Sequence, residues 1–162
     1  MPQRRWLDKD EQAAWRAYLL TTHLVDEALD RQLQRDAQMP HAYYGILVSL
    51  SEARDQSVRM TDLARGLRYS QSRMTHAITS MERSGWVDRR DCPTDRRSQL
   101  VAVTEDGMAA LRAAAPGHVA AVRGAIFDQL TTEQVTQLRE ICAAVLQGFE
   151  RQVTGDASAG SR

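Results

Sequence analysis

The sequence is poor in cysteine: Cys92 and Cys142 are its only two, and they lie 50 positions apart. They lack the close spacing of a zinc site and cannot form a disulfide scaffold, so we expect a reducing, cytoplasmic setting. No run of about 18 apolar residues occurs, which excludes a membrane-spanning helix. The first residues contain no apolar signal-peptide core, and we therefore expect no export.

Motifs of enzymes are also missing. The sequence contains no glycine-rich phosphate loop, no metal-binding helix pair and no nucleophile elbow. We therefore assign no catalytic residue, no cofactor and no metal. Two sensor alternatives stay open. His23, His41 and His118 could meet as a metal site, and oxidation of Cys92 could disturb the region around it.

Lysine is almost absent, because 20 of the 21 basic residues are arginine and only Lys9 is lysine. Arginine matches phosphate and guanine edges better than lysine does. An arginine-rich codon usage would give the same bias without any functional meaning.

The net charge is zero, but the charge is unevenly distributed. The stretch 59–97 holds nine arginines against five acids, which leaves +4 there and −4 over the rest. Between Asp62 and Glu82 there is no acid at all. A basic segment on an acidic body is typical of a protein that binds a phosphate backbone.

Periodicity and turn chemistry predict a mainly helical fold with about six helices and one small β-hairpin. We expect helices at about 10–36, 41–53, 62–68 and 71–84, with Thr61 capping the third and Ser70 or Ser72 the fourth. A strand from Trp86-Val87 and a partner at Gln99–Val103 form the hairpin. Two more helices follow, one after Thr104 that could kink at Pro116-Gly117, and one after a Thr131/Gln134 capping box.

The predicted helix 71–84 has the chemistry of a base-reading helix. Its inward side is apolar, and its outward side carries short hydroxyls, an amide and an arginine, without an acid before Glu82. An ordinary solvated helix face would mix in Glu or Asp, whereas a major groove needs this set. The candidate DNA contacts here are Ser70, Gln71, Ser72, Arg73, Thr75 and His76.

The hairpin adds a second candidate contact. Arg96-Arg97 at its tip could enter a minor groove, with Asp95 bracing the turn or one guanidinium. Arg89 and Arg90 point to opposite sides of their strand, so we expect one to face phosphate and the other to pair locally. We place Arg90, Asp95, Arg96 and Arg97 among the DNA contacts.

A helix–turn–helix followed by a basic hairpin is a winged helix–turn–helix, and here the sequence resembles the MarR family of transcription regulators. The resemblance covers about 11–150. Its most specific part is Arg83-x-Gly85-Trp86-Val87-x-Arg89, then Asp95-Arg96-Arg97, then Leu100-Val101-x-Val103-Thr104-x-x-Gly107. The Leu-Thr that begins the family's second helix is replaced by Met39-Pro40. The opening residues are similar to an actinobacterial-type subgroup.

The resemblance implies one domain over 1–153, with dimerisation helices at 10–38 and 105–153 around a winged helix–turn–helix at 40–104. We expect 154–162 to be a disordered tail. The implied function is a ligand-responsive repressor that binds a pseudo-palindromic operator as a homodimer.

A small-molecule effector pocket is implied between the dimer helices and the reading module. By position its candidate lining is Trp15, Tyr18, Leu19, His41, Tyr44 and Leu47, although plain core or interface is the favoured role of each. The rival interpretations are a metal- or redox-sensing regulator of the same fold, and a winged helix used as a protein-interaction module.

Overall fold

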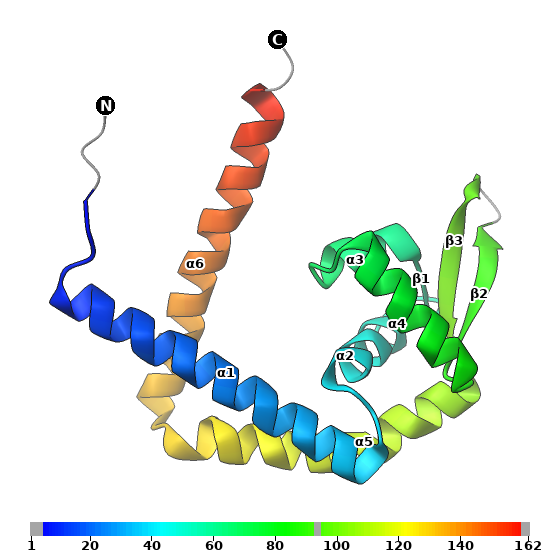
Figure 1. The fold of residues 1–162 in the computed structure, drawn as a ribbon, viewed down its shortest axis with the longest axis horizontal. Coiled ribbons are helices and arrows are strands. Elements are labelled where there is room, and N and C mark those ends of the chain that lie inside the picture. Colours follow the sequence, from blue (N-terminus) through cyan, green and yellow to red (C-terminus); the bar gives the residue numbers. More distant parts are fainter. Residues whose placement is uncertain (1–4, 93–94, 160–162) are drawn as a thin grey trace. The chain divides into compact units, whose positions relative to one another are not determined.

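The computed structural model describes the backbone of residues 5–92 and 95–159, and the side chains of 5–92 and 98–151. The chain divides into two compact units, 1–121 and 122–162 (Figure 1). The division falls inside helix α5 (Glu105–Ala125). Within the described ranges, no helix is long and apolar enough to cross a membrane.

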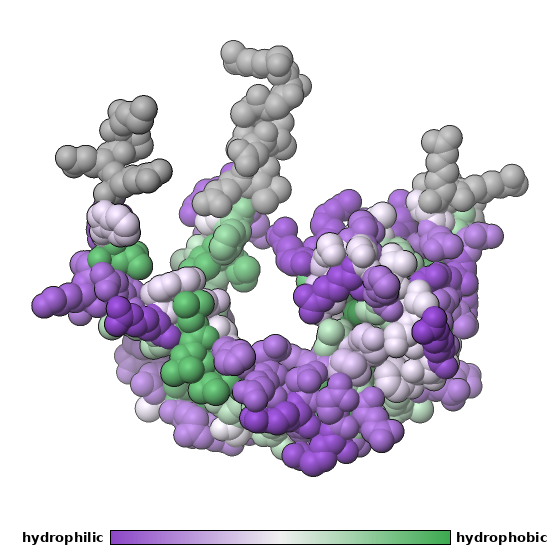
Figure 2. All heavy atoms as spheres, in the orientation of Figure 1, coloured by the Kyte–Doolittle hydropathy of each residue, from purple (hydrophilic) through white to green (hydrophobic). Residues whose placement is uncertain are grey.

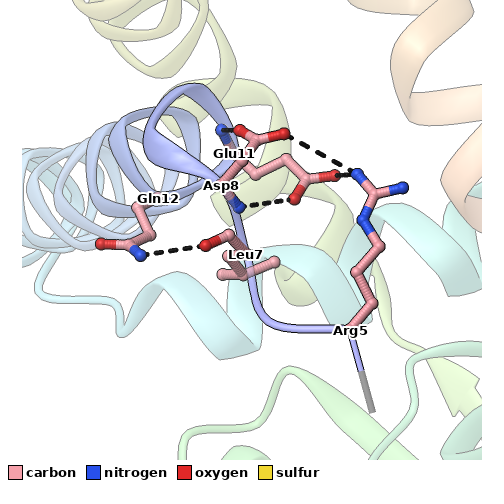
Figure 3. A network of polar contacts seen from close by, with 5 residues as sticks. All are labelled: Arg5, Leu7, Asp8, Glu11 and Gln12. Atoms are coloured by element: carbon pink, nitrogen blue, oxygen red, sulfur yellow. Dashed lines mark hydrogen bonds and ion pairs between the residues drawn. The ribbon is translucent and has the colours of Figure 1, made fainter. Parts of the chain in front are cut away.

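Helix α1 (Lys9–Ala37) begins at a capping box. The Asp8 carboxylate accepts from the Glu11 amide, and the Glu11 carboxylate accepts from the Asp8 amide, both at 2.9 Å (Figure 3). Arg5 pairs with Glu11 at 2.6 Å and adds a cation to this network. The helix ends where Gln38 takes a left-handed conformation, just before Pro40.

The amphipathic stripe predicted along α1 is buried only at its C-terminal end, at Leu29, Gln32 and Leu33. Trp15, Tyr18 and Leu19 are half exposed, so the N-terminal half of the helix has an apolar surface without a partner in this unit (Figure 2).

The expected winged helix–turn–helix follows as helix α2 (His41–Ser51), strand β1 (Ser57–Arg59), helix α3 (Met60–Gly66) and helix α4 (Gln71–Arg83). The prediction for α3 was wrong at both ends, because the helix begins at Met60 and stops at Gly66. Its N-cap is Arg59, which makes no side-chain capping bond, and Thr61 lies inside the first turn. Strand β1 pairs with the hairpin up to Arg59, and this pairing determines that α3 begins at Met60. A capping signal in the local sequence cannot reveal such a long-range pairing.

Strands β2 (Val87–Cys92) and β3 (Asp95–Val103) form the hairpin, and β1 pairs with the far side of β3 in the order β1-β3-β2. All pairs are antiparallel, with Arg89 opposite Val101. The predicted partner strand, Gln99–Val103, was too short, because β3 begins at Asp95. Gly85 has φ +73 after α4, as a glycine in the C′ position should.

The core lies between these elements. Fully buried side chains come from α1, α2, α3, α4 and both hairpin strands; they include Leu33, Ile46, Leu47, Leu50, Leu63, Met74, Ile78, Met81, Val87 and Val101. On α4 the buried positions are Met74, Ala77, Ile78 and Met81, the inward side that the sequence predicted. The opposite side of α4 is therefore held toward solvent.

Helix α5 is capped by Thr104, whose hydroxyl accepts from the Gly107 amide at 3.0 Å. The helix continues through Pro116. In the second unit, the 3₁₀ turn η1 (Phe127–Gln129) leads to helix α6 (Thr132–Ala159). The predicted capping box is confirmed there, because Thr131 and Gln134 exchange bonds of 2.9 and 3.2 Å. Helix α6 extends past Val153 into the segment for which we expected a tail.

Candidate nucleic-acid interface

The start of α4 presents the candidate base-reading residues to solvent. The Ser70 hydroxyl caps the helix by accepting from the Arg73 amide at 3.2 Å. The next two side chains, Gln71 and Ser72, are exposed, as are Thr75 and His76 one turn later. An uncapped helix start offers backbone N–H groups to anions, and Ser70 uses only one of them.

Arg73 is held in place by an aromatic neighbour. Its guanidinium carbon lies 4.2 Å from the ring centre of Tyr69, the residue before the N-cap. This cation–π contact limits the directions in which a long side chain can point. Tyr69 was not among the predicted site residues. An aromatic side chain just before the helix cap was the only signal in the sequence.

A groove of about 450 Å³ runs along one flank of α4, between that helix and the start of α2. Arg73, His76 and Arg83 line it with side chains that carry nitrogen donors, and Tyr43, Tyr69 and Ser80 line it with side chains that carry hydroxyls. These donors match an anionic partner, and no acidic residue lines the groove within the described part of the chain.

The other flank of α4 faces strand β2 and is occupied by Arg89. Its Nη2 donates to the Thr79 hydroxyl at 2.7 Å and to the Thr75 carbonyl at 3.4 Å. Its Nε lies 3.4 Å from the Glu82 carboxylate, an ion pair by distance whose orientation does not complete a hydrogen bond. Glu82 is the only acid of α4, so its charge is balanced beside the hairpin.

The structure shows which arginine of β2 packs against α4, and both have a carboxylate within 4 Å. Arg89 is the inward one, with 26% of its side chain exposed. Arg90 is outward, 63% exposed, and 3.9 Å from Asp88. The side chains of Asp95, Arg96 and Arg97 lie outside the described residues, so the predicted tip contacts are placed only by the backbone of β3.

The predicted effector residues fall into two groups. Trp15, Tyr18 and Leu19 are 51%, 59% and 47% exposed on α1. His41, on α2, forms a hydrogen bond with Asp26 of α1. Asp26 lies eleven residues after Trp15, which is about 16 Å along the helix axis, so His41 is far from the first group. The second group is formed by His41 and Tyr44, whereas Leu47 is fully buried in the core.

The second group gathers polar side chains from α1, α2 and α5. The His118 ring of α5 lies 4.2 Å from Tyr44 and 5.4 Å from His41, measured between ring centres. His118 Nδ1 and the side-chain oxygen of Gln32 are buried and lack a protein partner. Burial, then the charge of His41, lowers the pKa of His118 below its ordinary 6.5. Gln32 was missed as a site residue because its position in the stripe predicts plain core.

The metal alternative is not supported. No group of three or more His, Cys, Asp or Glu side chains suited to a metal ion occurs in the part of the chain that the structure describes. Cys92, the redox candidate, is 4% exposed, which leaves little access for an oxidant.

Three helices around a shared core, with the third one exposed beside a twisted β-hairpin, define a winged helix–turn–helix protein. The model of the MarR family matches residues 37–98, which include this module. The chain is 49% identical to Sco3205 of Streptomyces coelicolor, a MarR family transcriptional regulator solved in complex with DNA; the match covers 91% of this chain and 92% of that one, with a TM-score of 0.88.

AbsC, another MarR family regulator of Streptomyces coelicolor, is 38% identical with a TM-score of 0.85, over 90% of this chain and 98% of that one. The chain also shares 26% identity over 105 residues with the transcriptional repressor MprA of Escherichia coli, which is 65% of this chain and 59% of that protein. This protein belongs to the MarR family of transcriptional regulators.

Proposed function

We propose that the chain is a sequence-specific DNA-binding repressor that acts as a homodimer on a pseudo-palindromic operator. The exposed side of α4 carries the proposal, because its solvent-facing residues are neutral or basic and its single acid, Glu82, is paired with Arg89. The DNA complex of Sco3205, at 49% identity, supports the same role. We expect this protein to act in the cytoplasm.

In this proposal α4 enters the major groove. Gln71, Ser72, Arg73 and His76 reach base edges, while Ser70 and Thr75 lie near the phosphates. Thr75 already donates its hydroxyl to the Gln71 carbonyl at 2.8 Å, which favours a supporting role for it. Arg90 would contact phosphate from the hairpin, and Asp95, Arg96 and Arg97 would enter the adjacent minor groove. A two-fold dimer would place the second α4 about one helical turn, roughly 34 Å, away.

A duplex selected by the protein from a random pool, titrated at 50 and 200 mM salt, tests this function. With several phosphate contacts the affinity should fall about 10³-fold or more between the two concentrations. Selected sequences should also show two related half-sites. Equal weak binding to every duplex, without salt dependence, would instead indicate a protein-interaction module.

Arg73→Ala separates base reading from phosphate clamping. We expect the loss of about 1–3 kcal/mol on the selected duplex and a relaxed preference at one base pair. Arg112→Ala is the matched control, since Arg112 is an exposed arginine of α5 outside the interface. A uniform loss on all duplexes would show that Arg73 only binds phosphate.

We also propose that a small-molecule effector binds at the junction of α1, α2 and α5. The unpartnered polar atoms of Gln32 and His118 support this position, because buried polar atoms normally have a partner. His41 and Tyr44 complete the wall, and Trp15, Tyr18 and Leu19 remain candidates. Gln32→Leu should abolish the effector response while DNA binding persists. An unchanged response in that variant would move the effector site elsewhere.

A further inference from the structure

Arg89 connects the hairpin to the reading helix by three contacts. Its side chain leaves β2 and reaches the Thr79 hydroxyl, the Thr75 carbonyl and the Glu82 carboxylate at 2.7, 3.4 and 3.4 Å. With 26% of the side chain exposed, the guanidinium lies largely between the two elements. Its Nη2 group donates to both threonine oxygen atoms of α4.

The three partners form one stripe on α4. Positions 75, 79 and 82 are spaced i, i+4 and i+7, so they lie above one another along a single side of the helix. The Thr75 carbonyl points along the helix axis toward position 79, so the three contacted atoms lie within about one turn of the helix. A single planar guanidinium bridges them, so the contact resists both rotation of α4 about its axis and tilt against β2.

We propose that Arg89 is a positioning residue that fixes the angle between α4 and the hairpin. The inference rests on the proposed function, in which α4 and the hairpin enter neighbouring grooves of one duplex. Both elements can engage together only if their relative orientation is set before binding, because reorientation during binding weakens the complex. Arg89 therefore supports sequence discrimination without touching DNA.

The chemistry of the site requires arginine. A guanidinium presents five donors in a rigid plane, whereas the ammonium of lysine is a single point on a flexible stem. Lysine would keep the charge and lose the simultaneous contacts. Arg89→Lys is therefore informative: if Arg89 only supplied charge to phosphate, this variant would behave almost like the wild type.

A double-mutant cycle between Arg89→Met and Thr79→Val tests the proposal on the full chain. The readout is affinity for the selected duplex and for a mismatched duplex, each at two salt concentrations. We expect Arg89→Met to lose about tenfold on the selected duplex and less on the mismatched one. The salt dependence should not change, and the double variant should be no worse than Arg89→Met, since the two residues act through one contact.

Arg90→Met is the matched control from the same strand. Arg90 points outward, so its loss should weaken binding to all duplexes alike and reduce the salt slope by about one. If Arg89→Met behaves in that manner, or if its effect adds fully to that of Thr79→Val, Arg89 contacts phosphate and the proposal is wrong.

Two further outcomes are distinguishable. If Arg89→Met does not fold, Arg89→Lys replaces it, with relaxed preference at unchanged net charge as the expected result and wild-type preference as the contrary one. If the wild-type protein shows neither preference nor salt dependence, the proposed function itself fails. Wild-type binding combined with an additive cycle overturns only the role of Arg89.

Discussion

The guanidinium of Arg73 stacks on the ring of Tyr69, 4.2 Å from its centre, while its backbone amide is used by the Ser70 cap. Both ends of the residue are thus restrained before any partner arrives. A restrained side chain loses less conformational entropy on binding than a mobile one. Tyr69 should therefore influence DNA recognition without contacting a base.

Tyr69→Leu removes the ring and should reduce the preference for the base pair that we propose Arg73 reads by about two- to fivefold, the size of an exposed cation–π contact. Tyr69→Phe keeps the ring and is the control, with an expected change within about twofold. Competition binding between the selected duplex and single-base variants measures both. Equal losses in the two variants would point to the tyrosine hydroxyl in place of the ring.

His118 should make the folded protein sensitive to mild acid. Its pKa is lowered in the folded state, chiefly by burial, so below the ordinary value of 6.5 the unfolded chain binds more protons than the native one. The free energy of unfolding should therefore be fully retained above that value and decline as pH falls through it toward the folded pKa.

Urea unfolding at pH 7.5 and 5.5 measures this effect. His118→Gln, which cannot be protonated, should lose less stability between the two pH values than the wild type does. His76→Gln, at an exposed position of α4, should keep the wild-type difference. A wild-type-like difference in His118→Gln would mean that acid acts on another group.

At the scale of elements, one close approach fixes the junction of hairpin and α5. A Cβ on Gly107 would lie 2.1 Å from the Trp86 carbonyl oxygen and 2.9 Å from a Val103 methyl. Backbone cannot move aside as a flexible side chain can, so only glycine allows α5 to begin here. The sequence motif contained this glycine without revealing which atom excludes a side chain.

Gly107→Ala should destabilise the fold by about 2–4 kcal/mol, because overpacking against backbone forces α5 away from β3. Gly45→Ala in α2 is the contrasting variant, with nothing within 4 Å of the added carbon. There we expect a gain of up to about 1 kcal/mol from helix propensity. Chemical denaturation measures both. A neutral Gly107→Ala would show that the junction can relax.

The elements could be predicted where the signal is local. Periodicity and caps gave the six helices, the Ser70 cap, the C′ position of Gly85 and the Thr131/Gln134 box. The start of α3 and the length of β3 depend on strand pairing, which neighbouring residues do not encode. At the site, the outward side of α4 followed from its apolar spacing. The direction of Arg89 and the place of Tyr69 required packing in three dimensions.

At the scale of the whole molecule, both units expose apolar side chains to solvent. On α6 the exposed large hydrophobic residues are Leu138, Ile141, Val145, Leu146 and Phe149 (Figure 2). Four of them recur at steps of three and four residues, the spacing of a seam between helices. An exposed apolar stripe of this kind marks a protein interface, and a second copy of the chain is the proposed partner.

Ile141→Glu should raise the dissociation constant of the proposed dimer by at least about tenfold, because Ile141 lies in the middle of that stripe. Gln147→Glu introduces the same charge on the opposite side of α6 and should leave the dimer intact. Sedimentation equilibrium over a range of concentrations measures both. A dimer that is equally stable in the two variants would place its interface elsewhere.

The side chain of Thr104 couples the positions of two helices. Thr104 donates its side chain to the Gly85 carbonyl at 2.6 Å and accepts from the Gly107 amide, and its own amide bonds the Trp86 carbonyl. These bonds link the segment that follows α4 to the start of α5. If one helix tilts, the other must therefore tilt with it. His118 lies fourteen residues along α5, a lever arm of about 21 Å. A small displacement of α5 near His118 would therefore change the orientation of α4 at the opposite end of α5.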